Sequence, residues 1–118
     1  MKIPKKGKLL RIFIGEADRF KGKPLFEAIL LKAREIELAG VTILKGIEGF
    51  GANSRQIRTA HLLRLSEDLP IVVEMVDSEE KISKALPLFE EMIEASGCGV
   101  LVTLESVEVL HYNSISKD

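Results

Sequence analysis

The fold of this 118-residue chain is decided by residues 41–76, which read VTILKGIEGFGANSRQIRTAHLLRLSEDLPIVVEMV. At the start, Val41, Ile43 and Ile47 recur at the even spacing that is typical of a strand. At the end, Pro70 opens a second strand-like run, 71–76, whose nearly continuous apolar residues predict burial on both faces. The nineteen residues between them, 51–69, have no periodicity and exceed most connections in a compact domain. We therefore predict two consecutive strands joined by a long functional loop.

A strand and a helix precede this stretch. Residues 9–14 are short, apolar and partly β-branched, which predicts a strand, and a polar segment, 18–23, follows it. Pro24 stands where a helix can begin without losing a needed N–H, and Gly40 supplies a stop. Apolar residues recur between them at helical spacing, which predicts a helix facing the core: Phe26, Ile29, Leu30, Ala33 and Ile36.

A second helix and a last strand follow the stretch. We expect Asp77 to cap the helix with Glu80 completing a capping box, and Gly97 to end it. Its apolar stripe is Ile82, Leu86, Phe89 and Ile93, with a kink expected at Pro87. The last strand begins with Val100, Val102 and Leu104, then changes phase to Val107 and Val109, which predicts a bulge or a bend near Glu105.

The order strand, helix, strand, strand, helix, strand predicts an α+β ferredoxin-like plait, βαββαβ, as one domain over residues 1–118. Such a plait has a four-stranded antiparallel sheet with both helices on one face and the long loop between strands 2 and 3. The other sheet face would stand in water, so we expect other subunits to cover it.

Composition narrows the function. A net charge of -1 argues against general binding of nucleic acid or anionic membranes, and no apolar run predicts membrane insertion. Cys98 is the only cysteine, which fits a reducing cytoplasm and gives a thiolate-based tetrahedral zinc site too few ligands. His61 and His111 lack the spacing of metal ligands. We therefore expect no metal, no catalytic cofactor and no catalytic residues.

Two glycine-bearing turns are the candidate ligand sites. Gly49 and Gly51 flank Phe50 where the long loop begins. A glycine there can adopt a positive φ or let the backbone approach a ligand closely. We expect one or the other at Gly51 in particular. Arg55 and Arg58 follow within the loop and are donors suited to phosphate or carboxylate. A second turn, with Gly97 and Gly99, joins the last helix to the last strand. The competing interpretation of the glycines at 49–51 is that the strand end needs backbone freedom there and that no ligand binds.

These residues resemble the PII-like signal-transduction proteins, most closely a small prokaryotic branch of unknown function. The resemblance spans nearly the whole chain and includes the glycine-phenylalanine-glycine at 49–51, at the base of the family's long T-loop, and Leu69 with Pro70 before the third strand. It implies a homotrimer with sheets facing inward and adenine nucleotide held between subunits. It also implies a loop, 51–69, that docks on a protein target such as a transporter or an enzyme.

The chain departs from that family at two places. The turn at 96–100 lacks the lysine that ATP-holding relatives carry, and Lys117 is the only basic residue of the tail. The identity of the nucleotide therefore does not carry over. Three hypotheses stay open: a nucleotide-binding regulator, an assembly module whose loop binds a partner without a small ligand, and an enzyme or metal-handling protein that would need His61, His111 or Cys98 to converge. For the loop 52–68 we expect poor order without a partner.

Overall fold

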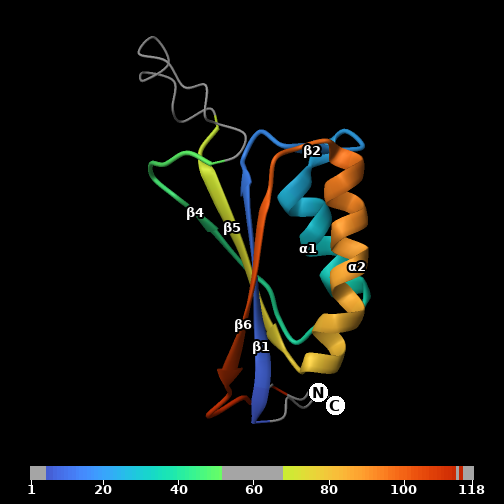
Figure 1. The fold of residues 1–118 in the computed structure, drawn as a ribbon, viewed down its shortest axis with the longest axis vertical. Coiled ribbons are helices and arrows are strands. Elements are labelled where there is room, and N and C mark those ends of the chain that lie inside the picture. The colour runs from blue at the N-terminus through green and yellow to red at the C-terminus, as the bar shows by residue number, and fades with distance from the viewer. Residues whose placement is uncertain (1–4, 52–67, 114, 116–118) are drawn as a thin grey trace.

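The protein, described by a computed structural model for residues 5–51, 68–113 and 115, is an antiparallel sheet with two helices packed on one face (Figure 1). The sheet has the order β4-β5-β1-β6, and the bounds of its strands are Thr42–Lys45, Pro70–Asp77, Lys6–Gly15 and Leu101–Glu108. The helices are α1, Leu25–Glu35, and α2, Glu79–Ser96. This arrangement confirms the predicted ferredoxin-like plait, with the long loop between β4 and β5.

The central strand β1 determines the register of the sheet. It pairs with β5 from Lys8 opposite Asp77 to Gly15 opposite Pro70, and with β6 from Lys6 opposite Glu108 to Phe13 opposite Leu101. Because the pairing with β6 is continuous, the predicted bulge near Glu105 is wrong. The apolar phase changes because β6 is an edge strand that the helices cover only in part: Val102 is half-buried, whereas Leu104 is 49% exposed.

The core lies between the helices and one face of the sheet. Alternate residues of β1 and β5 are buried there: Leu10, Ile12, Ile14, Ile71, Val73 and Met75. The intervening residues of β5 are only half-buried, so the prediction that this strand is buried on both faces is wrong for the single chain. Burial alternates along β5 although nearly all of its residues are apolar, because the two helices cover only one face of the sheet.

The helix α1 begins directly after Pro24, as predicted, but it ends at Glu35 rather than near Gly40. Glu37 has a φ of 62°, a left-handed conformation that stops the helix before the glycine is reached. The polar segment before α1 also contains a small hairpin, of β2, Arg19–Phe20, and β3, Lys23–Pro24, that the sequence patterns did not indicate. Its Phe20 packs against the core, which anchors the segment.

The helix α2 is capped by Ser78 and not by Asp77. The Ser78 hydroxyl accepts a hydrogen bond from the Lys81 N–H at 3.1 Å. Asp77 is fully buried, and its two carboxylate oxygens accept from the Ala39 N–H at 2.8 Å and the Ser78 N–H at 2.7 Å. The helix continues past Pro87 and ends, as predicted, at Gly97, whose φ is 72°. Its buried residues are Ile82, Ala85, Phe89 and Met92.

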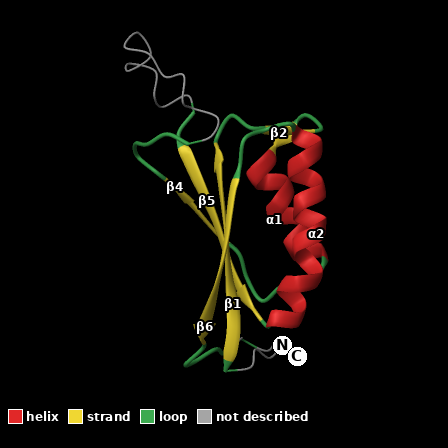
Figure 2. Cartoon of the chain, in the orientation of Figure 1, coloured by secondary structure: helices red, strands yellow, loops and turns green. Residues whose placement is uncertain are grey.

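The long loop leaves the sheet between β4 and β5. β4 ends at Lys45, earlier than predicted, and Ile47, which the spacing placed within the strand, lies beyond its end and is 92% exposed. We call residues 46–51 the outgoing stem and residues 68–69 the returning stem of the loop. Both lie at the end of the sheet where β1 ends and β6 begins (Figure 2). The prediction of poor order for 52–68 falls outside the described residues, apart from Asp68.

Candidate functional site

A pocket of about 190 Å³ opens where the two loop stems meet the end of the sheet. Its walls come from β1, both stems and the start of β6, and the side chains and glycines that shape it include Phe13, Phe50, Gly51, Asp68, Gly99 and Leu101. Three residues predicted from two distant turns, Phe50, Gly51 and Gly99, therefore line one cavity. Phe13 and Leu101 come from the sheet face away from the helices, so the pocket opens toward the uncovered side.

Backbone contacts fix each stem to the end of a neighbouring strand. The Gly46 N–H donates to the Pro70 carbonyl at 2.7 Å, and the Glu16 N–H donates to the Leu69 carbonyl at 2.8 Å. The contact at Gly46 is close, because a Cβ on this residue would lie 2.8 Å from the Pro70 Cγ. The base of the loop is thus built on the ends of β1, β4 and β5.

An ion pair also joins β1 and β4 at this base. The Lys45 Nζ lies 2.8 Å from the Glu16 Oε2, with the two side chains 52% and 30% exposed. The hydrogen bond from Lys45 lowers the pKa of the Glu16 carboxyl, more strongly than desolvation raises it. Glu16 is therefore held as a carboxylate over the ordinary pH range, and Lys45 is engaged outside the pocket.

Asp68 is the charged side chain on the pocket wall. Its Oδ1 accepts a hydrogen bond from the Ala17 N–H at 3.0 Å. A Cβ on Gly15 would stand 2.6 Å from the same oxygen, so the carboxylate occupies the space that a side chain would need. Sequence reasoning missed both residues, because each looks like an ordinary strand end until the fold brings them together.

The other predicted site residues lie around this pocket. Gly49 has a φ of 150° and packs against Pro70, so the outgoing stem does need a glycine there. Gly51 lines the pocket with open space at its Cβ position and without a positive φ, so the expectation of a positive φ there is wrong. The close approach of its backbone to a ligand stays a prediction. Gly97 lies outside the pocket, in a groove beside α2, and Arg55 lies outside the described residues.

Cys98 and His111 do not converge. Cys98 lines a shallow groove with Glu90, Glu91 and Glu94, near the start of β6. His111 lines a different cavity of about 410 Å³ with Leu9 and Tyr112, beyond the end of β6. His61 is outside the described residues, so of the pairs in the enzymatic hypothesis only Cys98 and His111 can be compared, and they lie on different cavities.

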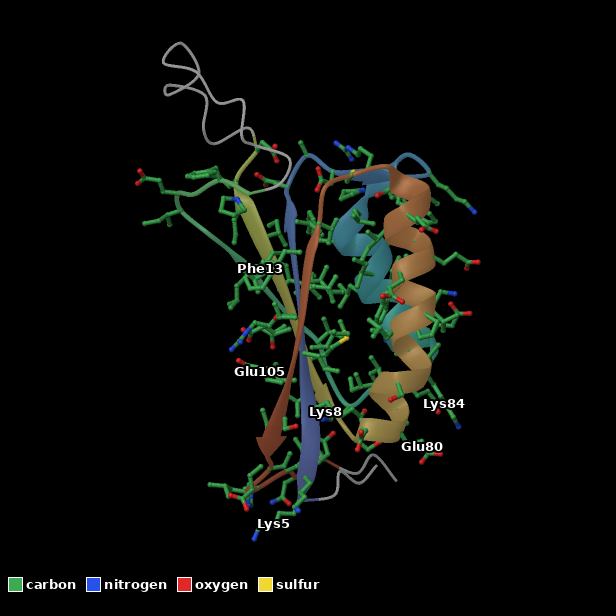
Figure 3. The ribbon with its side chains drawn as sticks, viewed as in Figure 1. Lys5, Lys8, Phe13, Glu80, Lys84 and Glu105 are labelled. Atoms are coloured by element: carbon green, nitrogen blue, oxygen red, sulfur yellow. The ribbon has the colours of Figure 1, made fainter. Side chains whose placement is uncertain are left out.

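The sheet face away from the helices carries one apolar row that crosses every strand of the sheet. The register aligns Leu44 of β4 with Val72 of β5, Val72 with Phe13 of β1, and Phe13 with Leu101 of β6. Leu44 is 49% and Leu101 56% exposed. Figure 3 shows Phe13 and Glu105 on this side of the sheet, opposite the helices. We call it the open face.

The neighbouring row of the open face is polar and centres on Arg11. Its Nε lies 2.8 Å from the Glu74 Oε2, and its Nη1 lies 3.2 Å from the Glu105 Oε1. The hydrogen bond with Glu74 contributes most to raising the pKa of the Arg11 guanidinium. Arg11 therefore ties the three strands β5, β1 and β6 together across the open face.

Solved structures of PII-like proteins share this fold. CPII, a nitrogen regulatory PII-like protein from Thiomonas intermedia K12 whose structure was determined with ADP, AMP and bicarbonate, matches with a TM-score of 0.63 at 20% identity, covering 88% of each chain. The protein thus has the PII-like, ferredoxin-type architecture. Within the described ranges, neither helix combines the length and apolar character needed to cross a bilayer.

Sequence relatives give the family. The profile described as "DUF190: Uncharacterized ACR, COG1993" matches residues 7–109, so the chain belongs to this family. A UPF0166 protein of Aquifex aeolicus (strain VF5) is 43% identical over 111 residues, which cover 94% of this chain and 99% of the relative. The UPF0166 protein MJ1524 of Methanocaldococcus jannaschii is 36% identical over 92 residues, covering 78% and 83% of the two chains.

Proposed function

We propose that this protein is a non-catalytic, cytoplasmic regulator that binds an adenine nucleotide in the pocket at the loop base and acts on a protein target through residues 51–69. The observation that carries the proposal is the meeting of Phe50, Gly51 and Gly99 in one cavity beside the open face. Both stems line this cavity, so a bound effector would contact the loop directly. Occupancy would then change the conformations that the loop can adopt.

An oligomer completes the proposed site. The pocket borders the open face, whose apolar row consists of Leu44, Val72, Phe13 and Leu101. Burial of this row against another copy of the chain would stabilise the protein. A trimer with the open faces inward would place a neighbouring subunit at the mouth of the pocket. CPII, with ADP and AMP in its structure, supports an adenine nucleotide as the first effector to test.

The chain's departures from PII-like relatives bear on which nucleotide binds. No lysine stands in the turn at 96–100, so a phosphate contact from that turn would have to come from backbone N–H groups. Arg55 within the loop is the nearest arginine in sequence to the outgoing stem. Nucleotides with different numbers of phosphates are therefore compared in the test.

Calorimetric titration of the purified protein with ATP, ADP, AMP and cyclic AMP tests the proposal. Phe50→Ala should weaken binding roughly tenfold, since it removes an aromatic wall. Ile47→Ala is the matched control, because Ile47 is exposed on the same stem but does not line the pocket. If the unmodified protein binds none of the four nucleotides, the proposal is wrong.

A second candidate function is an assembly or partner-binding module without a small ligand. It is favoured by the outgoing stem itself, where Ile47 is 92% and Phe50 77% exposed, because exposed apolar side chains of this size are common in protein contacts. In that case both alanine variants would weaken capture of a protein partner, and no nucleotide would bind.

A further inference from the structure

Among the described residues, the wall of the pocket at the loop base carries one charged group and is otherwise apolar or made of backbone. Phe13, Phe50 and Leu101 contribute apolar surface, Gly51 and Gly99 contribute backbone, and Asp68 contributes a carboxylate. This carboxylate has a fixed position, because the Ala17 N–H donates to its Oδ1 at 3.0 Å and because Gly15 has no side chain to displace it. An acceptor held in this way is part of the pocket's shape.

The second oxygen of Asp68 is available to a ligand. The hydrogen bond from Ala17 uses Oδ1, and no donor from the described residues is placed on Oδ2. Within that same part of the chain no cationic side chain lines the pocket, and Lys45 at the loop base is bound to Glu16 instead. A phosphate oxygen beside Asp68 would therefore meet a like charge that no cation of the described residues offsets, whereas a neutral O–H or N–H group would find an acceptor.

The size of the pocket also restricts its occupant. Pockets that enclose a whole drug-sized ligand measure about 300–1,000 Å³. The cavity here measures about 190 Å³, so it encloses only part of a nucleotide. An aromatic and apolar wall suits a base or a sugar far better than a polyphosphate.

From this geometry we propose that the pocket receives the uncharged nucleoside end of the effector, with Asp68 accepting a hydrogen bond from a hydroxyl or amino group, and that the phosphates lie outside the pocket. This assignment rests on the proposed function and makes Asp68 the residue that determines which end of the nucleotide enters. The donor is either a ribose hydroxyl or the amino group of the base, and nucleotide analogues that lack one or the other group distinguish the two.

Asp68→Asn tests the role of the carboxylate with little change in shape. Asparagine keeps an oxygen for the Ala17 N–H, but its NH2 group replaces the oxygen that would accept from the ligand, so two donors would face each other. Adenosine, AMP and ADP should therefore all bind about tenfold to a hundredfold more weakly. Glu16→Gln is the matched control, because it removes the same charge at the loop base but outside the pocket. It should change each affinity by less than about threefold.

Ligand analogues test the same contact on the unmodified protein and identify the donor. Inosine diphosphate lacks the amino group of the base, and 2′-deoxy-ADP and 3′-deoxy-ADP each lack one ribose hydroxyl. If only inosine diphosphate binds more weakly than ADP, the donor is the amino group. If only a deoxy analogue binds more weakly, the donor is the ribose hydroxyl that it lacks. If all three analogues bind as tightly as ADP, or if Asp68→Asn strengthens AMP and ADP binding, the orientation is wrong while the proposed function stands. If the unmodified protein binds no adenine nucleotide, both are wrong.

Discussion

Two glycines in the outgoing stem have opposite steric surroundings, although the sequence presents them alike. A Cβ on Gly46 would meet the Pro70 ring at 2.8 Å, whereas a Cβ on Gly51 would meet no atom within 4 Å. The proline ring is rigid and belongs to the first residue of β5, so it has little freedom to move aside. The outgoing stem is therefore sterically crowded at Gly46, where it contacts β5, and not at Gly51, where it lines the pocket.

We expect Gly46→Ala to lower the free energy of unfolding by about 1–3 kcal/mol, because the added methyl group overpacks the contact with Pro70. Gly51→Ala is the matched control in the same stem and should change the free energy of unfolding by less than about 0.5 kcal/mol. Urea denaturation followed by circular dichroism measures both values. Equal effects of the two substitutions would contradict the steric account.

At the scale of elements, the loop base depends on contacts between strand ends. The Glu16–Lys45 ion pair at 2.8 Å links the end of β1 to the end of β4, and the Glu16 N–H binds the returning stem at Leu69. The first contact uses the Glu16 side chain and the second its backbone, so removing the carboxylate charge breaks the ion pair but leaves the hydrogen bond to Leu69 in place.

The pH dependence of this base follows from the lowered pKa of Glu16. The ion pair contributes its stabilisation fully above the pKa of an unfolded glutamate, about 4.3, and loses it as the pH falls through the lower folded value. Lys45→Met should move the pKa of Glu16 upward, which an NMR titration of its carboxyl carbon measures. Lys84→Met serves as the control, since Lys84 pairs with Glu80 on the distant helix α2. An unchanged Glu16 titration in Lys45→Met would show that the pair does not form in solution.

Local signals in the sequence were sufficient for most elements and insufficient for the site. Pro24 and Gly97 mark helix ends through their own backbone preferences, which act within one turn, and both predictions are confirmed. Ser78 and Asp77 are both good capping residues, and only the burial of Asp77 against Ala39 decides between them. Likewise, Asp68 enters the pocket because the fold brings it to Gly15 and Ala17, fifty-one positions from the latter. Contacts of that range leave no periodic signal.

At the scale of the whole molecule, the open face is the sheet surface opposite the helices (Figure 1), where Leu44 is 49% and Leu101 56% exposed. It combines the apolar row with the Arg11 network, whose two carboxylate partners, Glu74 and Glu105, lie on the strands at either side. Apolar residues supply the free energy of association, and a fixed pattern of charges favours one alignment of the faces over others. Both features suit a face that packs against copies of the same chain.

Phe13→Asp should dissociate the proposed trimer. Phe13 occupies the middle of the apolar row on the central strand, and burying a phenylalanine contributes about 1.5–3 kcal/mol at each contact. A carboxylate there would lose this contribution and add a desolvation cost when the face is covered. Light scattering at micromolar concentration should give three times the chain mass for the unmodified protein and a smaller mass for Phe13→Asp. Leu31→Asp, at a 47% exposed position of α1, is the control that keeps the full mass. A monomer mass for the unmodified protein, or a Phe13→Asp variant that keeps the full mass while circular dichroism shows it folded, would contradict assembly through the open face.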